Sequence, residues 1–260
     1  MALISFTSVS GTRGLTTTVV GLGLTWPRPV IVVEADPSGG SQMLAGYFRG
    51  LARPGLSELV LAHRQHQLAQ ELPARLFPAA DSQASFLPGI RSPLQSPTMV
   101  GVWDELLEAL RELEASSPVD VLVDAGRLGL VGAPVPLIGE ADLTVVLAGS
   151  GLPELACLRS WLPWLRRGTA ELRLLLQEPG RPYSAADVER DLGVPVIGTL
   201  PWDQQAARWW SHGEAQHRFE RTPLAKAVNG LGEQLRACPA NRRPVAAEPT
   251  GVAHEWRRTQ

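Results

Sequence analysis

Short runs of apolar residues recur along the chain, separated by more polar segments. The runs span Ala2–Phe6, Val30–Val33, Val119–Val123, Leu143–Ala148, Leu172–Leu176 and Val194–Leu200. They are rich in valine, isoleucine and leucine and do not alternate with polar residues, which is typical of strands buried on both faces of a parallel sheet. We therefore predict a doubly wound α/β fold: a mainly parallel sheet flanked by helices, in a single domain.

Two of the intervening helices can be placed from their side-chain pattern. In Val102–Glu114, apolar residues recur at helical spacing and charged residues take the other face, so this helix should pack on the sheet. Ser184 and Asp187 have the spacing of a helix cap, and Gly193 supplies a stop, which predicts a short helix between them.

Proline-rich stretches predict the irregular parts of the chain. Four prolines in Pro78–Pro97 indicate a long irregular connection. Prolines and scattered charges after Cys238 predict a flexible tail over residues 238–260, so the folded domain should cover residues 1–237.

Composition excludes several functions. The chain carries 24 basic and 26 acidic residues, for a net charge of −2, which argues against a surface devoted to nucleic acid. Its two cysteines, Cys157 and Cys238, have neither the number nor the spacing for a disulfide framework or a zinc site, which favours a reduced, cytoplasmic setting. We expect no secretion signal and no integral membrane segment, because no apolar run approaches about 18 residues.

The segment Ser5–Thr18 contains the most informative motif. It follows a predicted strand and precedes a predicted helix, where backbone amides and a helix N-terminus can face a phosphate. Gly11 and Gly14 supply backbone freedom, and Thr16 stands where a hydroxyl would ligate Mg²⁺ bound to a nucleotide.

This loop resembles the deviant Walker A motif, KGGxGKTT, of the ParA/MinD family of P-loop ATPases. Ser10 takes the place of the signature lysine, and Leu15 takes the place of the ordinary Walker lysine. The only lysine in the chain is Lys226, far beyond the loop. The resemblance assigns nucleotide binding to Gly11, Thr12, Arg13, Gly14, Leu15, Thr16 and Thr17.

Three further segments are similar to motifs of the same family, in the same order. Val30–Gly40 resembles the strand that ends in D-x-D-P; there Asp36 matches the catalytic carboxylate, and Glu34 replaces the first aspartate. Asp120–Gly126 resembles the Walker B strand, which implies that Asp124 acts with Thr16 at Mg²⁺. Leu192–Asp203 resembles the segment whose loop lines the adenine pocket, which places Pro201 near the base. The implied cofactors are ATP or ADP with Mg²⁺.

The resemblance implies a dimerising factor in spatial organisation or assembly that binds a protein partner. Because both motif lysines are absent, we expect weak ATP hydrolysis or none. Two alternatives stay open. In one, the protein is an active partitioning or positioning ATPase in which Arg13 replaces the lysines, although the favoured interpretation of Arg13 is a variable loop residue that points to solvent. In the other, it is a synthase-type or amidotransferase-type relative, for which the sequence shows no nucleophilic cysteine or glutaminase-like triad.

Other residues carry competing interpretations. Asp36 could simply cap the turn that follows it. Asp120 is expected to be a solvated residue at the start of its strand. In the polar setting of Trp209 and Trp210, at least one ring is expected to be exposed, where it could contact a partner.

The remaining candidates are contacts with DNA and with a membrane surface. Arg208, Arg218 and Arg221 could form a local arginine patch for DNA, which has no other support in the sequence. Val252–Gln260 has no apolar stripe, so a membrane-targeting helix is not expected there.

Overall fold

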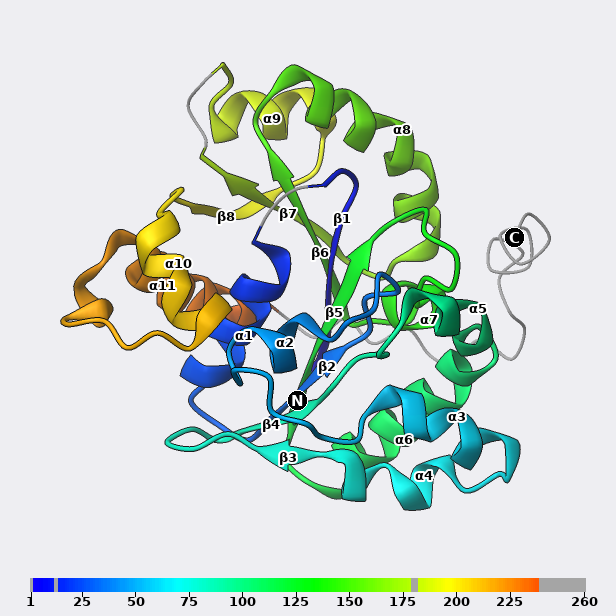
Figure 1. Cartoon of the computed structure of the whole chain (residues 1–260). Helices are drawn as coiled ribbons and strands as arrows, with labels where there is room; N and C mark the ends of the chain where they lie inside the picture. The colour runs from blue at the N-terminus through cyan, green and yellow to red at the C-terminus, as the bar shows by residue number, and fades with distance from the viewer. Residues whose placement is uncertain (1, 12–13, 179–181, 239–260) are drawn as a thin grey trace.

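The structure is a computed structural model, and it describes residues 2–11, 14–178 and 182–238. Its centre is an eight-stranded sheet with the order β3-β4-β2-β5-β1-β6-β7-β8. Every neighbouring pair is parallel except the antiparallel pair of β3 and β4. The predicted mainly parallel, doubly wound sheet is therefore confirmed (Figure 1).

The six predicted strands all form, and two short strands, β3 and β4, were not predicted. In chain order, the strands of the sheet are β1 (Leu3–Ser8), β2 (Val30–Glu34), β3 (Phe77–Pro78), β4 (Ala84–Leu87), β5 (Asp120–Arg127), β6 (Leu143–Gly149), β7 (Leu172–Gln177) and β8 (Val196–Leu200). Most of their side chains are buried on both faces, as expected for strands covered by helices.

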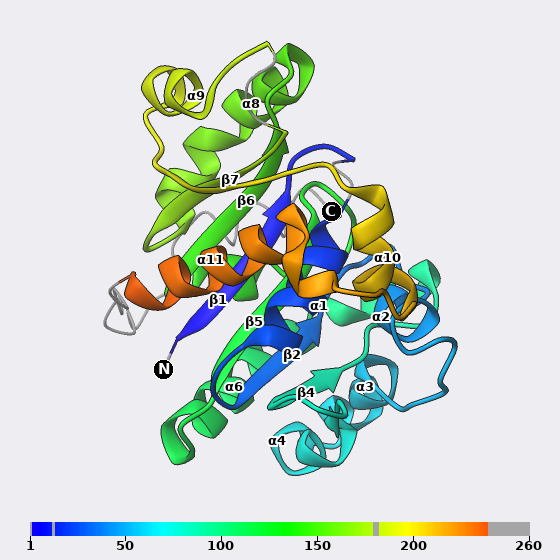
Figure 2. The ribbon, with the colours of Figure 1, turned by 90° about the vertical axis from the view of Figure 1, so that its left-hand side faces the viewer.

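Helices cover the two faces of the sheet unequally. The helices are α1 (Leu15–Thr25), α2 (Gln42–Ala45), α3 (Leu56–Arg64), α4 (Leu68–Glu71), α5 (Ser96–Met99), α6 (Val102–Ser116), α7 (Val135–Gly139), α8 (Leu152–Gly168), α9 (Ala185–Leu192), α10 (Gln204–His212) and α11 (Pro223–Ala237), with short 3₁₀ turns at η1 (Pro73–Arg75), η2 (Pro93–Gln95) and η3 (Phe219–Arg221). One apolar cluster joins the sheet to α3, α4 and α6 to α9. A second joins the opposite face to α1, α2, α10 and α11, and Figure 2 shows α1 and α11 in front of the sheet.

The two helices predicted in detail are confirmed. Helix α6 begins at Val102, and the apolar face of the helix, which includes Trp103, Leu106 and Leu110, is buried. In α9, the Ser184 side chain accepts from the Asp187 backbone N–H, and Gly193 closes the helix with a φ of 60°. The glycine is suited to this left-handed position because it has no Cβ.

The prediction of an irregular connection over Pro78–Pro97 was wrong in part. Ala84–Leu87 forms β4, which pairs with β2, and η2 and α5 follow it. A run of four residues between prolines carries too little periodicity to reveal a strand, and here pairing with a distant strand determines the structure. Of the predicted tail over 238–260, all residues after Cys238 lie outside the described residues.

Asp120 is fully buried, so the expectation of a solvated residue was wrong. Its carboxylate accepts from the Ala2 backbone N–H at 2.9 Å and from the Trp26 indole N–H at 2.7 Å, and it forms an ion pair with Arg28. These donors balance the charge at the amino end of β5. Asp120 therefore ties the start of β1 to the end of α1 and is structural.

The indole of Trp210 is also buried, with 2% of its surface exposed. Its ring lies against Gly21 of α1 so closely that a Cβ at that position would be 2.7 Å from ring carbons. Trp209 is half-buried and stacks on Phe219. The exposed tryptophan in this part of the chain is Trp202, at 43%.

No helix in the described part of the chain combines the length and the apolar character required to cross a bilayer.

Candidate nucleotide-binding site

The loop between β1 and α1 ends in an open helix N-terminus. Gly14 is the N-cap of α1 in the left-handed conformation, with a φ of 95°, and as a glycine it supplies no side-chain cap. No acidic residue occupies the first turn of the helix. Because the first amides of a helix have no partner within the helix and lie at the positive end of its dipole, this end of α1 can accept a phosphate.

Leu15 faces the interior rather than the loop. It is 7% exposed and packs in the same apolar cluster as Phe6, Val19 and Leu147. The position that the family motif gives to a lysine is thus occupied by a core residue. Thr12 and Arg13 lie outside the described residues, so their predicted roles stay predictions.

The beginning of the loop is in contact with α8. The Ser10 hydroxyl lies 3.5 Å from Glu154 Oε1, and the Cys157 thiol lies 3.1 Å from the Val9 carbonyl oxygen. Glu154 folds over Gly149 at the end of β6, where any Cβ would collide with its carboxylate. Ser10, which the resemblance aligns with the signature lysine, therefore lies beside a carboxylate.

Asp124 is completely buried within β5, where it pairs in register with Glu34, the last residue of β2. Its Oδ1 accepts from the Gly126 backbone N–H at 3.1 Å. Burial, followed by the charges of Asp36 and Glu34, raises its pKa to about 7, while the hydroxyl of Thr16 opposes the shift. Although Thr16 is near enough to act in this way, no hydrogen bond of ordinary geometry reaches Oδ2 among the described residues.

This buried oxygen fits a magnesium site. A buried carboxylate oxygen without a donor is costly, and one that faces a threonine hydroxyl is a natural neighbour of hydrated Mg²⁺, which takes oxygen ligands and keeps several waters. Asp124 and Thr16 could therefore hold the cation that accompanies a nucleotide. No group of three acidic, histidine or cysteine residues with metal-binding geometry occurs among the described residues.

Asp36 caps the turn that follows it, as the structural interpretation of this residue predicted. Its Oδ1 accepts from the backbone N–H of Ser38 at 2.8 Å and from its hydroxyl at 2.5 Å. Its carboxyl group also lies against Gly126, where a Cβ would come within 2.5 Å of it. Asp36 thus lies beside the Asp124 segment, and its catalytic role stays a prediction.

Glu34 is buried and holds three segments together. Its Oε2 accepts from the Ser41 hydroxyl at 2.5 Å and the Gly89 N–H at 2.8 Å, and its Oε1 accepts from the Met43 N–H at 3.0 Å. Burial raises its pKa in spite of these donors, and the nearby Asp36 adds to the shift. The glutamate therefore connects the end of β2 to α2 and to the segment after β4.

The ends of β7 and β8 extend the site away from the loop. The Gln177 amide, at the end of β7, is 3.5 Å from where a Cβ of Gly14 would stand. The Glu178 N–H donates to the Leu200 carbonyl at 2.9 Å, which brings the start of the β8 loop alongside. Pro201 and the exposed Trp202 follow directly.

The structure brings the predicted site residues to one edge of the sheet. Beyond the carboxyl ends of parallel strands lie Gly11, Gly14, Thr16, Thr17, Asp36 and Pro201, while Asp124 lies within β5 level with the end of β2. In open α/β sheets, ligands bind at this edge. Two residues beside the loop, Glu154 and Gln177, were not among the candidates from sequence. The position of Gln177 at the end of an apolar run could have indicated it, whereas no local pattern indicated Glu154.

Comparison with known proteins identifies the fold. No family model matches the chain, and no curated protein sequence matches it. Among solved structures, the MinD cell division protein of Aquifex aeolicus is similar to this chain with a TM-score of 0.71 at 15% identity, and the match covers 95% of this chain and 100% of that chain. The same MinD protein has also been solved in complex with MinC.

Two further structures agree. The septum site-determining protein MinD of Pyrococcus horikoshii OT3, solved in complex with Mg-ADP, has a TM-score of 0.67 at 15% identity and covers 89% of this chain and 94% of that chain. A ParA family ATPase from Chlorobium tepidum TLS has a TM-score of 0.68 at 17% identity and covers 90% of this chain and 98% of that chain. The chain therefore has the fold of the ParA/MinD P-loop ATPases, as the sequence motifs predicted.

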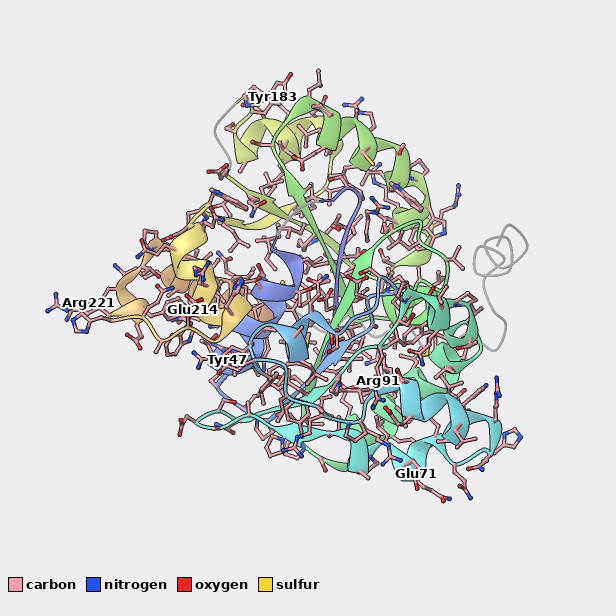
Figure 3. The ribbon with its side chains drawn as sticks, viewed as in Figure 1. Tyr47, Glu71, Arg91, Tyr183, Glu214 and Arg221 are labelled. Atoms are coloured by element: carbon pink, nitrogen blue, oxygen red, sulfur yellow. The ribbon has the colours of Figure 1, made fainter. Side chains whose placement is uncertain are left out.

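Of the three arginines considered for DNA, Arg208 is held in an ion pair, whereas Arg218 and Arg221 are exposed. Arg208 pairs with Glu214, and the pairing raises the pKa of the arginine and lowers that of the glutamate. Figure 3 shows Arg221 projecting outward from the periphery of the molecule, beyond Glu214.

Proposed function

We propose that this chain is a nucleotide-binding protein of ParA/MinD-like fold that binds ADP or ATP with Mg²⁺ and hydrolyses ATP weakly or not at all. Its cellular role would be that of a dimerising factor in spatial organisation or assembly. The observation that carries the proposal is the burial of Leu15 at the motif's lysine position, in a loop that otherwise keeps the elements of a phosphate site.

Binding is supported by three features that do not need a lysine. The first turn of α1 is open, the loop ends in a left-handed glycine, and Thr16 faces the buried Asp124. Backbone amides at a helix N-terminus bind phosphate by themselves, and the pair of Thr16 and Asp124 suits Mg²⁺. The likeness to a MinD solved with Mg-ADP supports the same ligand.

Hydrolysis is disfavoured because positive charge must offset the charge that develops on the transferred phosphoryl group. A leucine can neither donate a hydrogen bond nor carry charge. Losing one such catalytic donor typically costs about 10²–10³ in rate. We therefore expect turnover far below that of a P-loop ATPase with its lysines.

Contact with a second protein is supported by exposed apolar side chains at the same edge of the sheet. Leu94, Val131 and Leu152 are 87%, 53% and 62% exposed, and each lies in or after a segment that leaves a strand's carboxyl end. The complex of a structurally similar MinD with MinC supports a protein partner for this chain as well. Dimerisation should be measured by light scattering with and without nucleotide.

Isothermal titration with ADP and ATP in the presence of Mg²⁺, together with phosphate-release assays, tests the proposal. We expect saturable binding without steady hydrolysis, and weaker binding by Thr16→Val. Thr25→Val is the matched control, because Thr25 lies at the other end of α1 and bonds to the Gly21 carbonyl. Absence of binding to the wild-type protein would refute the proposal. Steady hydrolysis that Arg13→Ala abolishes would instead establish the alternative in which Arg13 replaces the lysines.

A further inference from the structure

We infer that Arg127, the last residue of β5, binds the phosphate groups of the nucleotide and supplies positive charge that neither lysine position of the motif carries. Those positions hold Ser10 and Leu15, and neither side chain is charged. This inference rests on the proposed function and adds a binding residue to it, because the segments that resemble the family motifs assign no role to Arg127. The ligand is the anionic phosphate chain of ADP or ATP.

The backbone on both sides of Arg127 is fixed to the strand that leads into the loop. The Thr7 hydroxyl donates to the Gly126 carbonyl oxygen at 2.9 Å, and the Leu128 N–H donates to the Ser8 carbonyl oxygen at 2.8 Å. Arg127 itself lies in register with Ser8, the last residue of β1. Because neighbouring strands are about 4.8 Å apart, the Arg127 backbone lies one strand spacing from the residue at which the loop begins.

Gly126 bends the strand immediately before Arg127. Its φ is 63°, in the left-handed region that glycine adopts without strain. A Cβ at this position would also come within 2.5 Å of the Asp36 carboxyl group. At the same point the register between β1 and β5 shifts by one residue, between Phe6 and Ser8 of β1, as in a β-bulge. The bend therefore fixes where Arg127 leaves the sheet.

The shift also decides on which face of the sheet Arg127 lies. Asp124 pairs in register with Phe6, and Arg127 pairs in register with Ser8. Phe6 and Ser8 are two residues apart and share a face, whereas Asp124 and Arg127 are three residues apart and would lie on opposite faces of a regular strand. Because residues in register share a face, the extra residue brings Arg127 to the face of Phe6, against which α1 packs.

The guanidinium group of Arg127 is free to take an anionic ligand. Its side chain is exposed and forms no ion pair or hydrogen bond with any residue that the structure describes. The Arg91 side chain, which follows β4, is instead paired with Glu58. Arg127 is thus an arginine whose backbone is held in place and whose charge is left for a ligand.

The chemistry of arginine matches a phosphate at this place. The planar guanidinium group can donate two parallel hydrogen bonds to phosphate oxygens. The open N-terminus of α1 offers the same anion a partial charge, equal to about half an elementary charge. Because the arginine side chain is longer than one strand spacing, the guanidinium group of Arg127 can cross from β5 to a phosphate at the loop between β1 and α1.

Calorimetric titration of ADP and of ATP into the full chain, with Mg²⁺, tests the inference. Arg127→Ala should weaken binding of both nucleotides by about 10- to 100-fold, which is the usual effect of losing a hydrogen bond to a charged group. Arg127→Lys keeps the charge but loses the fork of donors, so it should recover part of the affinity.

The matched control is Arg167→Ala. Arg167 is also exposed, and it lies in the last turn of α8, about 20 Å along the helix from Glu154, which is beside the loop. This variant carries the same change of charge and should bind both nucleotides as tightly as wild type.

A role in binding has a signature that a structural role lacks. Because salt screens exposed charges, raising the ionic strength should weaken binding by wild type more than binding by Arg127→Ala. Because the Arg127 side chain is exposed, guanidinium unfolding followed by circular dichroism should give the variant and wild type the same midpoint.

Each contrary outcome has a distinct meaning. If Arg127→Ala bound both nucleotides as tightly as wild type, the inference would be overturned and the proposed function would stand. Equal losses in Arg127→Ala and Arg167→Ala would overturn it too, because they would reflect net charge rather than a site. Loss of binding in Arg13→Ala alone would name that arginine as the phosphate-binding residue instead. Absence of binding by wild type would refute the proposed function, and the inference with it.

Discussion

Shortening Glu34 to aspartate should destabilise the protein, even though aspartate is the residue that the family motif has at this position. The Glu34 carboxylate is 2% exposed and accepts from Ser41, Met43 and Gly89 at distances of 2.5 to 3.0 Å. Removing one methylene withdraws the oxygens by about 1.5 Å, which puts all three donors beyond hydrogen-bonding range unless the backbone moves.

The expected cost follows from the number of donors. A buried donor that loses its partner costs about 1–3 kcal/mol, so three donors that relax in part should cost about 3 kcal/mol in the free energy of unfolding. For a domain of this size that corresponds to a fall in Tm of roughly 6–12 °C. The loss should appear as a lower denaturant midpoint with an unchanged m value.

Guanidinium unfolding followed by circular dichroism is the assay. Glu112→Asp, at an exposed position of α6, is the control for the same chemical change and should cost no more than about 0.5 kcal/mol. If Glu34→Asp were as stable as this control, the three hydrogen bonds could not be holding β2, α2 and the segment after β4 together.

Three further predictions concern stability and binding. Burial raises the pKa of Glu34 above its ordinary value of 4.5, so its contribution to stability is fully present below pH 4.5 and is lost as the pH rises through the folded pKa. The stability of wild type relative to Glu34→Leu, measured by denaturant titration, should therefore be lower at alkaline than at acidic pH. A difference that does not change with pH would contradict the pKa shift. Gly21→Ala should lower the free energy of unfolding by about 1–3 kcal/mol, because the new methyl group would meet the Trp210 ring. Its control, Gly230→Ala, lies in open space on α11 and should leave that free energy unchanged or raise it by up to about 1 kcal/mol. Equal denaturation midpoints for these two alanine variants would show that Trp210 moves aside freely. Addition of ADP and Mg²⁺ should change tryptophan emission through the exposed Trp202, and Trp202→Phe should remove most of that change; an undiminished signal would place the base elsewhere.

The fold could be predicted from sequence where the local pattern and the tertiary structure agree. Strands such as β6 are buried on both faces, so their apolar runs are unbroken and easy to recognise. The α9 helix has its cap and its stop within the segment itself. By contrast, β4 forms because β2 offers a partner, and nothing in Ala84–Leu87 alone distinguishes it from a loop.

Sequence can nominate a candidate site residue where the reason belongs to one residue, but it cannot reveal a contact that belongs to a pair. Asp124 was nominated because a carboxylate at the end of an apolar strand requires a reason, and its role at a metal stays a prediction. The contact of Ser10 with Glu154 joins residues 144 positions apart, and no local pattern encodes it. Asp120 was misjudged for the same reason: the donors that make its burial tolerable come from Trp26 and Arg28, which lie far away in the chain.

The burial of Leu15 has a consequence for redesign of the loop. A lysine introduced at position 15 would place its ammonium group in the apolar cluster that contains Phe6, Val19 and Leu147. Desolvating an unpaired charge there would cost stability before any catalysis was recovered. Neighbouring core residues would have to change first, each without benefit of its own. The apolar packing of Leu15 thus makes its replacement by lysine unfavourable unless the surrounding core is redesigned with it.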